Sequence, residues 1–529
     1  MPPAAGRRSD SAHPRHDPRL SRRLLLQAGG ISAGTLALGI NAPHARATPL
    51  AGDPFTLGVA AGSPGDQSMV LWTRLALDPL AADGHGGMPL ENVTVRWEVA
   101  RDKEFKDVVQ RGTAVAQPAL AHSVHPQVTG LRPATSYWYR FRVGDQISPV
   151  GRFRTLPAAG QLVPEFTLAA ASCQAWYHGH FTAHRHLAAE SDLDLVVFLG
   201  DYIYEYAIVA GDNLWRKNAS VTAAEEVEIE TLEQYRLRYA RFKADPQLQA
   251  AHARAAWVFT WDDHEVENGY ARRHSRDGIP DALFPHRIAV AYRAFYENLP
   301  VSVEALPDGP STTIYDSYDI GSLARLMMID GRQHRDLQPT GDDRYDPERT
   351  MLGETQERWL HERLQESPAR WNMIGNAVSM IPVRPDTELD SWDAYPAARG
   401  RLMRSLDGVS NPVVLTGDIH RAVAAELPAD LTDPTGRKLA VELICTSIGS
   451  DGDGAETDGY ADDWLRYPYV RFYHARRGYL LVRLTPEEMT STYVSVEWVE
   501  ADDTAPRQVA AAFRTPAGTS RLDPIEGAL

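Results

Sequence analysis

The stretch LVVFLGDYIYE spans residues 195–205, where five apolar residues run into Gly200, Asp201, Tyr202 and Tyr204. A short apolar run that stops at a glycine and a carboxylate is typical of a buried strand whose carboxyl end carries a site in an open α/β sheet. Asp201 and Tyr204 offer a carboxylate and a phenolate that could bind one metal ion, since phenolate oxygen suits a ferric ion. In isolation the pattern also fits an Asp that forms a turn or caps a helix.

Three further apolar runs end in polar residues of the same kind. Residues 166–171 lead into Cys173, residues 256–261 lead into Asp263 and His264, and residues 413–416 lead into Asp418 and His420. Strand ends of this type meet at one edge of an α/β sheet, so we expect these side chains to lie close together. Their chemistry predicts a polynuclear metal site.

The composition is that of a globular protein. The chain has 529 residues, of which 43% are apolar and 9% aromatic, enough for two or three domains. Its formal net charge is -16 at pH 7. An acidic surface argues against docking on nucleic-acid backbones or anionic lipids, which both need basic patches. We therefore expect no nucleic-acid-binding surface.

The N-terminus carries a targeting pattern. Residues 21–26 read SRRLLL, a twin-arginine motif, and are followed by the mildly apolar residues 29–40 and by the small-x-small sequence Ala45-Arg46-Ala47. The apolar stretch is too short to cross a bilayer, and no other segment reaches spanning length. We expect residues 1–47 to be a signal peptide read by the twin-arginine translocase. The mature protein would then begin near Thr48, in the periplasm or outside the cell.

The two cysteines, Cys173 and Cys445, allow two interpretations. In an exported chain they would usually form a disulfide. Twin-arginine export resembles a route for proteins that are already folded and metal-loaded in the cytoplasm, where thiols stay reduced. We therefore favour Cys173 as a thiolate ligand for iron or zinc, and Cys445, in the apolar run VELICTSIG, as a core residue.

The first part of the mature chain is predicted to be all-β. Residues 55–157 contain strand-like runs and no helical periodicity. Within them VTGLRPATSYWYRF, residues 128–141, resembles the E–F corner of fibronectin type III modules, where a Leu-x-Pro turn leads into a strand of alternating aromatic residues. We expect an N-terminal fibronectin-III-like β-sandwich domain.

Strands and helices alternate from residue 165 to about residue 500, which predicts a two-sheet α/β sandwich. A longer helical region is expected over residues 231–254, starting at a Thr231/Gln234 capping box. Residues 501–529 are expected to be a C-terminal tail. Further helices are predicted at 178–190, 286–298, 354–367 and 392–406, and further strands at 324–330, 371–375, 440–448, 479–484 and 492–499.

The motifs also carry a family resemblance. In chain order they are Cys173, GDYIYE (200–205), WDDHEVEN (261–268), IGN (374–376) and LTGDIH (415–420). This series resembles the calcineurin-like metallophosphoesterase superfamily and, within it, the alkaline phosphatase D (PhoD-like) family. The wider superfamily holds a metal pair with Asp, GDxxY, GNH and GHxH segments. Here Cys173 stands for the first Asp, Asp263 for the Asn and Asp418 for a His, as in the PhoD-like family, which is associated with a ferric ion and calcium.

The resemblance implies a ligand set. Fe3+ would be held by Cys173, Tyr204, Asp418 and His420, with Asp201 bridging to Ca2+. Asp263 would bind the calcium, with Asn268 as a further candidate. Carboxylates at Asp263 and Asp418, where the wider pattern has an amide and an imidazole, make the second position harder and more anionic, which favours calcium. Glu267 and Asn376 are left open as further ligands, and Asn376 could equally be a hydrogen-bonded core amide.

Two residues are predicted to act on the substrate. His264 stands where the superfamily has the histidine of its GNH segment, and would protonate the leaving group. Alternatively it hydrogen-bonds a metal ligand. Arg332, in IDGRQHRD, could bind phosphate in bidentate fashion, or form a surface ion pair with Asp330 or Asp336.

The predicted function is therefore hydrolysis of small-molecule or polymeric phosphate esters by a metal-activated hydroxide, in an exported alkaline phosphatase or phosphodiesterase. One alternative is a phosphodiesterase specific for nucleotide, phospholipid or teichoic-acid diesters, because the same ions serve mono- and diesters. The other is a non-catalytic surface-binding protein with structural metals, although a closed structural site has no use for a free His264 and Arg332.

Overall fold

The computed structural model describes residues 50–382 and 390–526. The predicted signal peptide, residues 1–47, lies outside this range. Contacts group the described residues into one unit. Within the described residues, no helix combines the length and apolar character needed to cross a membrane.

An 11-stranded sheet, called sheet 1 here, contains three of the four strands that the sequence predicts at the site. β10, β11 and β12 are parallel neighbours, so their carboxyl ends lie at one edge. Its strand order is β24-β23-β22-β21-β10-β11-β12-β1-β2-β5, with β6 paired to β2. The bounds in that order are Asp523–Pro524, Arg507–Pro516, Glu488–Val496, Gly478–Leu484, Phe166–Ala171, Leu195–Leu199, Ala256–Thr260, Ala60–Gly62, Ser68–Arg74, Ser123–Val124 and, for β6, Gln127–Thr129.

An 8-stranded sheet, called sheet 2 here, holds the fourth strand, β16. Its order is β13-β14-β15-β16-β18-β17-β20-β19, and β14, β15, β16 and β18 are parallel. The bounds in that order are Asp316–Ile320, Ala324–Met328, Trp371–Asn376, Pro412–Thr416, Lys438–Ile444, Ala422–Pro428, Val470–Arg476 and Gly454–Ala455.

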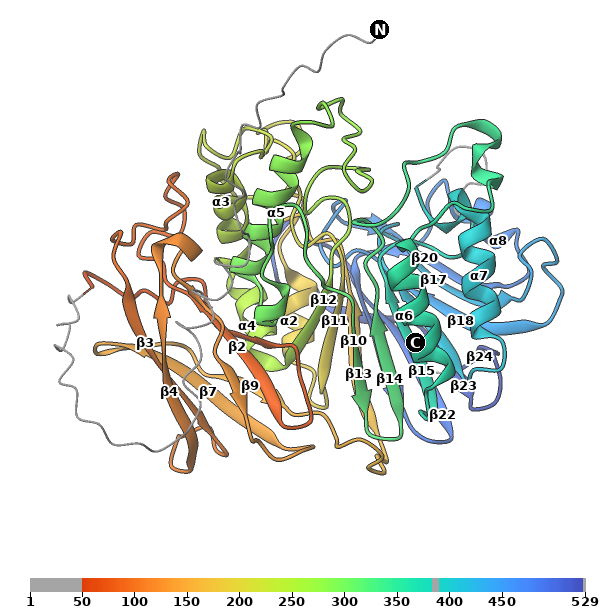
Figure 1. Cartoon of the computed structure of the whole chain (residues 1–529), viewed down its shortest axis with the longest axis horizontal. Coiled ribbons are helices and arrows are strands. Elements are labelled where there is room, and N and C mark those ends of the chain that lie inside the picture. Colours follow the sequence, from red (N-terminus) through yellow and green to blue (C-terminus); the bar gives the residue numbers. More distant parts are fainter. Residues whose placement is uncertain (1–49, 383–389, 527–529) are drawn as a thin grey trace, which may run out of the picture. The chain divides into compact units, whose positions relative to one another are not determined.

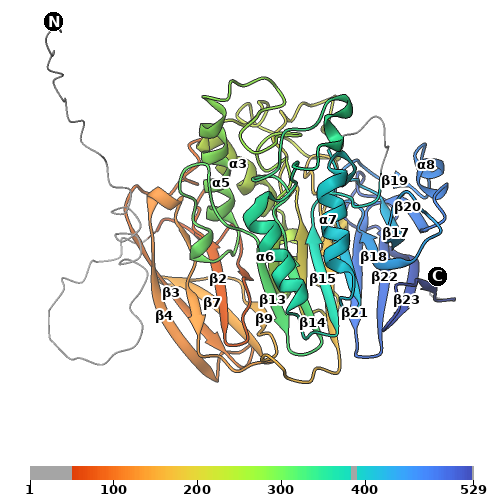
Figure 2. The ribbon, with the colours of Figure 1, turned by 45° about the vertical axis from the view of Figure 1, so that its right-hand side comes forward.

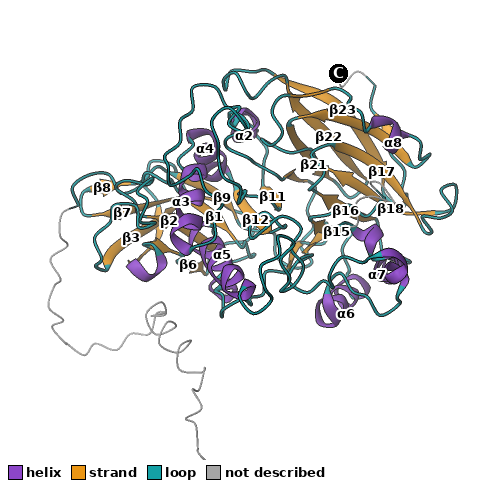
Figure 3. Ribbon diagram, turned by 90° about the horizontal axis from the view of Figure 1, so that it is seen from above, coloured by secondary structure: helices purple, strands orange, loops and turns teal. Residues whose placement is uncertain are grey.

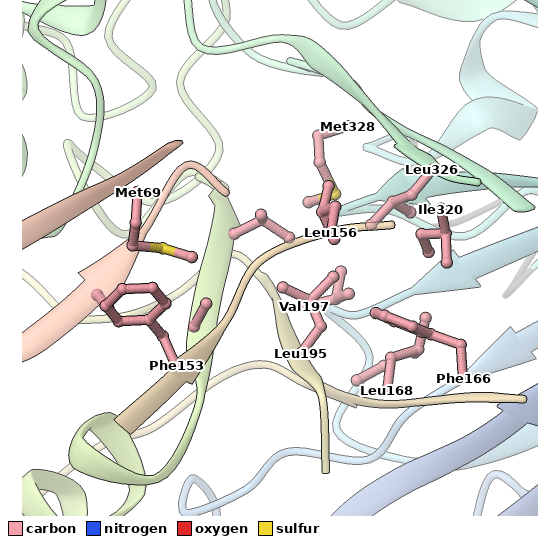
Figure 4. Packing of buried hydrophobic residues seen from close by; sticks show 14 of the residues in the cluster. Met69, Phe153, Leu156, Phe166, Leu168, Leu195, Val197, Ile320, Leu326 and Met328 are labelled. Atoms are coloured by element: carbon pink, nitrogen blue, oxygen red, sulfur yellow. The ribbon is translucent and has the colours of Figure 1, made fainter. Parts of the chain in front are cut away.

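The two sheets face each other across one apolar core. Leu168 and Val197 of sheet 1 belong to the same buried cluster as Leu326 and Met328 of sheet 2 (Figure 4). Side chains alternate along each strand, so the other face of each sheet needs its own cover. Helices provide it (Figures 1 and 2), with α2 to α5 packed on sheet 1 and α6 and α7 on sheet 2. The view from above shows α6 and α7 beside β15, β16 and β18 (Figure 3).

The helices agree only partly with the prediction. α3 begins at the predicted capping box, where the Thr231 side chain accepts from the Gln234 N–H and the Gln234 side chain from the Thr231 N–H. The helical region predicted over 231–254 consists of two helices, because Asp245 caps a new helix with Pro246 at its first position. The helices α2 to α8 span Thr182–Ala188, Leu232–Lys243, Pro246–Arg254, Phe284–Asn298, Gly353–Gln365, Pro396–Leu406 and Ala461–Leu465.

The N-terminal strands are divided between two sheets. β1 pairs in parallel with β12, so β1, β2, β5 and β6 extend sheet 1. The others form a third, 5-stranded sheet in the order β4-β3-β7-β8, with β9 paired to β7. Its strands β3, β4, β7, β8 and β9 span Val93–Ala100, Val108–Ala116, Ser136–Val143, Gln146–Ile147 and Gly151–Arg154.

The C-terminal residues are not only a tail. β23 pairs along the length of β22 and carries the buried residues Ala512 and Phe513. The segment expected to be a tail therefore contributes the sheet strand Arg507–Pro516, which corrects that expectation. The physical reason is pairing with β22 together with burial of Phe513, which belongs to the core shared by sheets 1 and 2.

Two glycines allow the strand ends to approach one another. A Cβ on Gly200, whose φ is +96°, would lie 2.6 Å from Asp262 Cβ, so the turns after β11 and β12 touch here. A Cβ on Gly417 would lie 2.8 Å from the Leu199 carbonyl oxygen and 2.8 Å from Ser172 Cβ. Gly417 is thus where the end of β16 meets the ends of β10 and β11.

Gly417→Ala is expected to lower the free energy of unfolding by about 1–3 kcal/mol, because the added methyl group forces the two sheet ends apart. Gly459→Ala is the matched control, since no atom lies within 4 Å of its Cβ position. Chemical denaturation measures both. Equal stability of the two variants would contradict the close approach.

Candidate metal centre

Four predicted site residues have left-handed backbone conformations at strand ends. Their φ angles are 58° for Cys173, 56° for Asp201, 68° for Asp418 and 55° for His420. Residues other than glycine rarely adopt this region, at a cost of order 1–3 kcal/mol each. Such strain is typical of functional sites, where it holds side chains in directions that a regular strand would not give them.

A first group of donors brings together Cys173, Asp201 and His420. One potential ligand atom from each lies within 4.8 Å of the others. The Tyr204 hydroxyl donates to Asp201 Oδ2 at 3.2 Å and lies 3.0 Å from His420 Nε2, so it joins this group. The Ser450 hydroxyl, which the sequence analysis did not single out, donates to the Tyr204 oxygen at 2.9 Å.

A second group consists of Asp201, Asp263 and His264, again with ligand atoms within 4.8 Å of one another. Asp201 belongs to both groups, which is the position of a bridging ligand. Its Oδ1 atom is buried and has no hydrogen-bond partner among the described residues. A buried carboxylate oxygen without a partner is costly in a protein, and a cation is the partner that this oxygen could accept.

Electrostatics of the first group favour a bound cation. Burial raises the pKa of Asp201 well above its ordinary value; the charge of His264 opposes this shift and the Asp263 carboxylate adds to it. Burial also raises the pKa values of Cys173 and Tyr204, and the Asp201 carboxylate raises both further. Positive charge placed among them would stabilise carboxylate, thiolate and phenolate together.

Asp418 lies outside both groups. Its carbonyl oxygen is 3.9 Å from Cys173 Sγ. Burial raises the pKa of its carboxyl group, and the carboxylates of Asp262 and Asp263 raise it further. The charges that act on Asp418 are therefore those beside the second group, and its assignment to iron stays a prediction.

The three remaining candidate metal ligands form hydrogen bonds or ion pairs with protein groups. For Asn268, the backbone N–H donates to Glu205 Oε1 at 2.7 Å. Glu267 is fully buried and pairs with Arg287 at 2.9 Å, so it anchors the segment that follows the site. The Asn376 amide donates to a backbone carbonyl and accepts from the Trp392 indole at 3.2 Å, as the core-amide alternative predicts.

His264 is held by a buried carboxylate. Its Nδ1 lies 2.7 Å from Glu205 Oε2, and its ring packs against the Tyr204 ring with centroids 4.3 Å apart. Burial lowers the pKa of His264, but the carboxylates of Glu205, Asp201 and Asp263 outweigh it and raise the pKa well above its ordinary value. With Nδ1 engaged, Nε2 is the nitrogen left for a substrate.

Arg332 is buried among carboxylates. Its Nε donates to Asp262 Oδ1, and its Nη2 lies 2.7 Å from Asp390 Oδ2 and 3.6 Å from Asp263 Oδ1. Neither Asp330 nor Asp336 pairs with the guanidinium, so the surface ion pair is wrong. Arg332 Nη1 is buried without a hydrogen-bond partner among the described residues, which leaves the two N–H groups of this nitrogen for phosphoryl oxygens.

Three carboxylates that sequence reasoning did not assign hold the ligands in place. Glu205 orients His264. Glu265 Oε2 accepts from the N–H groups of Asp201 at 3.2 Å and Asp262 at 2.8 Å, and so joins the turns after β11 and β12. Asp451 Oδ2 lies 2.8 Å from His420 Nδ1. Glu205 lies inside the GDYIYE motif and Glu265 inside the WDDHEVEN motif. Their place in these motifs is the sequence signal that could have identified them.

Comparison with known proteins agrees with this geometry. A family model described as PhoD-like phosphatase matches residues 168–493, and the model of the N-terminal domain of PhoD-like phosphatases matches residues 41–157. The chain belongs to the PhoD-like phosphatase family. As a member of this family it is a phosphoric ester hydrolase.

Two PhoD-like proteins match most of the chain. Alkaline phosphatase D of Bacillus subtilis (strain 168) is 42% identical over 495 residues, which cover 89% of this chain and 84% of that protein. A solved structure of PhoD is 40% identical, covers 91% of this chain and 94% of its own, and has a TM-score of 0.86. The mixed α/β fold is thereby confirmed.

Glu265 accepts from the backbone N–H groups of Asp201, Tyr202 and Asp262. Glu265→Gln is expected to lower metal affinity or phosphatase activity about 10–100-fold, because an amide NH2 group then stands where one of the two accepting oxygens was. The measurement is metal content after dialysis together with the rate of ester hydrolysis.

Glu297→Gln is the matched control. It also removes a buried carboxylate, which pairs with Arg236 at 2.7 Å. We expect this variant to lose stability but keep its metal. Unchanged metal content and activity in Glu265→Gln would contradict the positioning role.

Proposed function

We propose that this PhoD-like phosphatase uses Fe3+ and Ca2+ to hydrolyse phosphate esters. The observation that carries the proposal is Asp201, which is shared by both donor groups and has one buried oxygen without a partner. Thiolate, phenolate and imidazole from Cys173, Tyr204 and His420 suit a ferric ion. Oxygen donors such as Asp263 suit calcium, for which Asn268 is a further candidate ligand, while Asp418 is proposed as a further ligand of the iron.

The ions, when bound, would supply Lewis-acid neutralisation of phosphoryl oxygens and activation of the attacking water. The chain's own part is proton transfer and positioning. His264, raised in pKa and fixed at Nδ1 by Glu205, carries a proton at Nε2 that it gives to the leaving alcohol oxygen. Arg332 Nη1 is available to hydrogen-bond the phosphoryl group, while Asp262 and Asp390 hold the rest of the guanidinium.

We propose an alkaline phosphatase that also cleaves phosphodiesters. Support for the alkaline activity comes from the relative named alkaline phosphatase D. The two groups of metal ligands suit monoesters and diesters alike. Each kind of ester presents phosphoryl oxygens to metal ions and a leaving oxygen to a general acid. Polymeric as well as small substrates are compatible with this chemistry.

We further propose export by the twin-arginine translocase to the periplasm or the medium, on the basis of the SRRLLL sequence at residues 21–26. The cysteines support loading in a reducing compartment, since Cys173 and Cys445 are both buried and free. A thiol that is a metal ligand must escape oxidation until the metal is bound.

We also propose that the fold is the two-sheet metallophosphoesterase sandwich with a fibronectin-III-like N-terminal domain. The Tyr137 hydroxyl accepts from the Arg132 N–H at 3.0 Å, the contact of a tyrosine corner. The shared core of sheets 1 and 2 supports the sandwich.

The test is hydrolysis of p-nitrophenyl phosphate and bis(p-nitrophenyl) phosphate at alkaline pH by the purified protein, before and after chelation, with metal content measured in parallel. We expect iron and calcium to be present, both esters to be cleaved, and chelation to reduce turnover by at least about 100-fold, with recovery when both ions are restored.

Activity that survives complete removal of metal would contradict the proposal. Bound metal without turnover of either ester would favour the structural-metal alternative. Turnover of the diester alone would favour a dedicated phosphodiesterase.

A further inference from the structure

Tyr206 is an exposed aromatic residue at the edge of the metal centre. It directly follows Glu205, the last residue of the GDYIYE motif, and is 37% exposed. Glu205 before it and Ile208 after it are both completely buried. The chain therefore turns one aromatic ring toward solvent between two anchored residues.

The fold itself makes little use of this ring. The Tyr206 hydroxyl group has no hydrogen-bond partner among the described residues. The ring neither belongs to nor packs against the hydrophobic cores of the described chain. Its one ring contact within the described residues is with His264, where the centroids are 5.3 Å apart and the ring planes are inclined at 64°. A single exposed apolar residue needs no explanation, but this one contacts the residue that is proposed to protonate the leaving group.

Tyr206 is also the solvent-facing neighbour of His264. The His264 side chain is only 14% exposed, and its Nδ1 lies 2.7 Å from the buried carboxylate of Glu205. The buried ring of Tyr204 packs against it with centroids 4.3 Å apart. Asp201 and Asp263, whose carboxylates also lie beside His264, are buried too. A leaving group that reaches His264 from solvent is therefore expected to come past the Tyr206 ring.

The backbone fixes the position of this ring from both sides. Glu205 accepts from the Asn268 N–H at 2.7 Å, and the Ile208 N–H donates to the Glu225 carbonyl oxygen at 3.1 Å. The side chain of Glu225 is in turn paired with Arg241. A binding group that is already held in place loses less conformational entropy on association than a mobile one.

We propose that Tyr206 is a specificity-determining residue that binds an aromatic ring on the leaving alcohol. The inference rests on the proposed function, because it takes His264 as the proton donor. A proton donor must come within about 2.6–3.2 Å of the oxygen that it protonates. Aromatic rings attract each other when their centroids are about 4.5–7 Å apart. A ring joined to the leaving oxygen through one carbon atom would therefore lie within reach of Tyr206.

The surroundings favour a neutral ring over a cationic group. An ammonium group can bind the face of a tyrosine ring. Here, however, it would lie beside the proton that His264 carries in the proposed function, and like charges at such short range repel each other. A polyol would use the Tyr206 hydroxyl group and not the ring, so the two modes of recognition are separable by substitution.

The experiment compares benzyl phosphate with ethyl phosphate as substrates of the metal-loaded, full-length enzyme. Their leaving alcohols have nearly the same acidity, so the ratio of the two kcat/KM values reports recognition of the ring and not ease of bond cleavage. We expect benzyl phosphate to be favoured about tenfold by the unaltered enzyme, and no more than about twofold by Tyr206→Ala. A purely structural role would lower kcat for both substrates and leave their ratio unchanged.

Two further variants separate the ring from the hydroxyl group and from aromatic surface in general. Tyr206→Phe keeps the ring and should keep the preference for benzyl phosphate. Tyr345→Ala is the matched control, because it removes a 59% exposed ring from the short helix η3 (Gly341–Tyr345). It should also keep the preference. Loss of the preference in Tyr206→Phe, or an equal loss in Tyr345→Ala, would overturn the proposal.

Binding is measured separately from turnover. Calorimetry compares 2-phenylethylphosphonate with propylphosphonate, in which a methylene group replaces the leaving oxygen and leaves no ester bond to cleave. We expect the aromatic phosphonate to bind about tenfold more tightly to the unaltered enzyme, and the two to bind about equally to Tyr206→Ala.

Equal kcat/KM values for the two esters in the unaltered enzyme would overturn this inference and leave the proposed function intact. An equal preference for cyclohexylmethyl phosphate would make the subsite apolar and not aromatic, and a preference for choline phosphate would make it cationic. Either result would overturn the choice of ligand. Failure of the metal-loaded enzyme to hydrolyse either ester would count against the proposed function, while phosphonate binding would still decide the role of Tyr206.

Discussion

The buried carboxylate of Asp201 is the constraint on which the site depends. It is 1% exposed, one of its oxygens receives only the Tyr204 hydroxyl, and the other has no hydrogen-bond partner among the described residues. Burying an ionised carboxylate without a counter-charge costs several kcal/mol. The strained turns at Cys173 and His420 add a further cost in free energy. Binding of metal ions would offset both the burial of the carboxylate and this strain.

The surrounding structure serves to keep that carboxylate and its neighbours in place. Gly200 and Gly417 let the ends of β11, β12 and β16 come close enough for one site to draw on both sheets. Glu265 then joins two of these turns through their N–H groups, and Glu205 fixes the ring of His264. Precision at a metal centre depends on such outer contacts as much as on the ligands themselves.

Much of this could be predicted from local sequence. β10 and β11 were delimited correctly because apolar runs end at polar strand termini. Features set by long-range pairing could not be predicted in the same way, because β1 joins β12 across nearly 200 residues. The environment of Asp418, beside Asp262 and Asp263, likewise depends on how two sheets meet.

The central claim concerns the metal centre, and anomalous X-ray diffraction from crystals of the holoenzyme, recorded on both sides of the iron absorption edge, tests it most directly. The account predicts an iron peak between Cys173, Asp201, Tyr204 and His420, and a second, non-iron cation on the Asp263 side of Asp201. Density without an iron edge at the first position, or no cation in contact with Asp201, would contradict it.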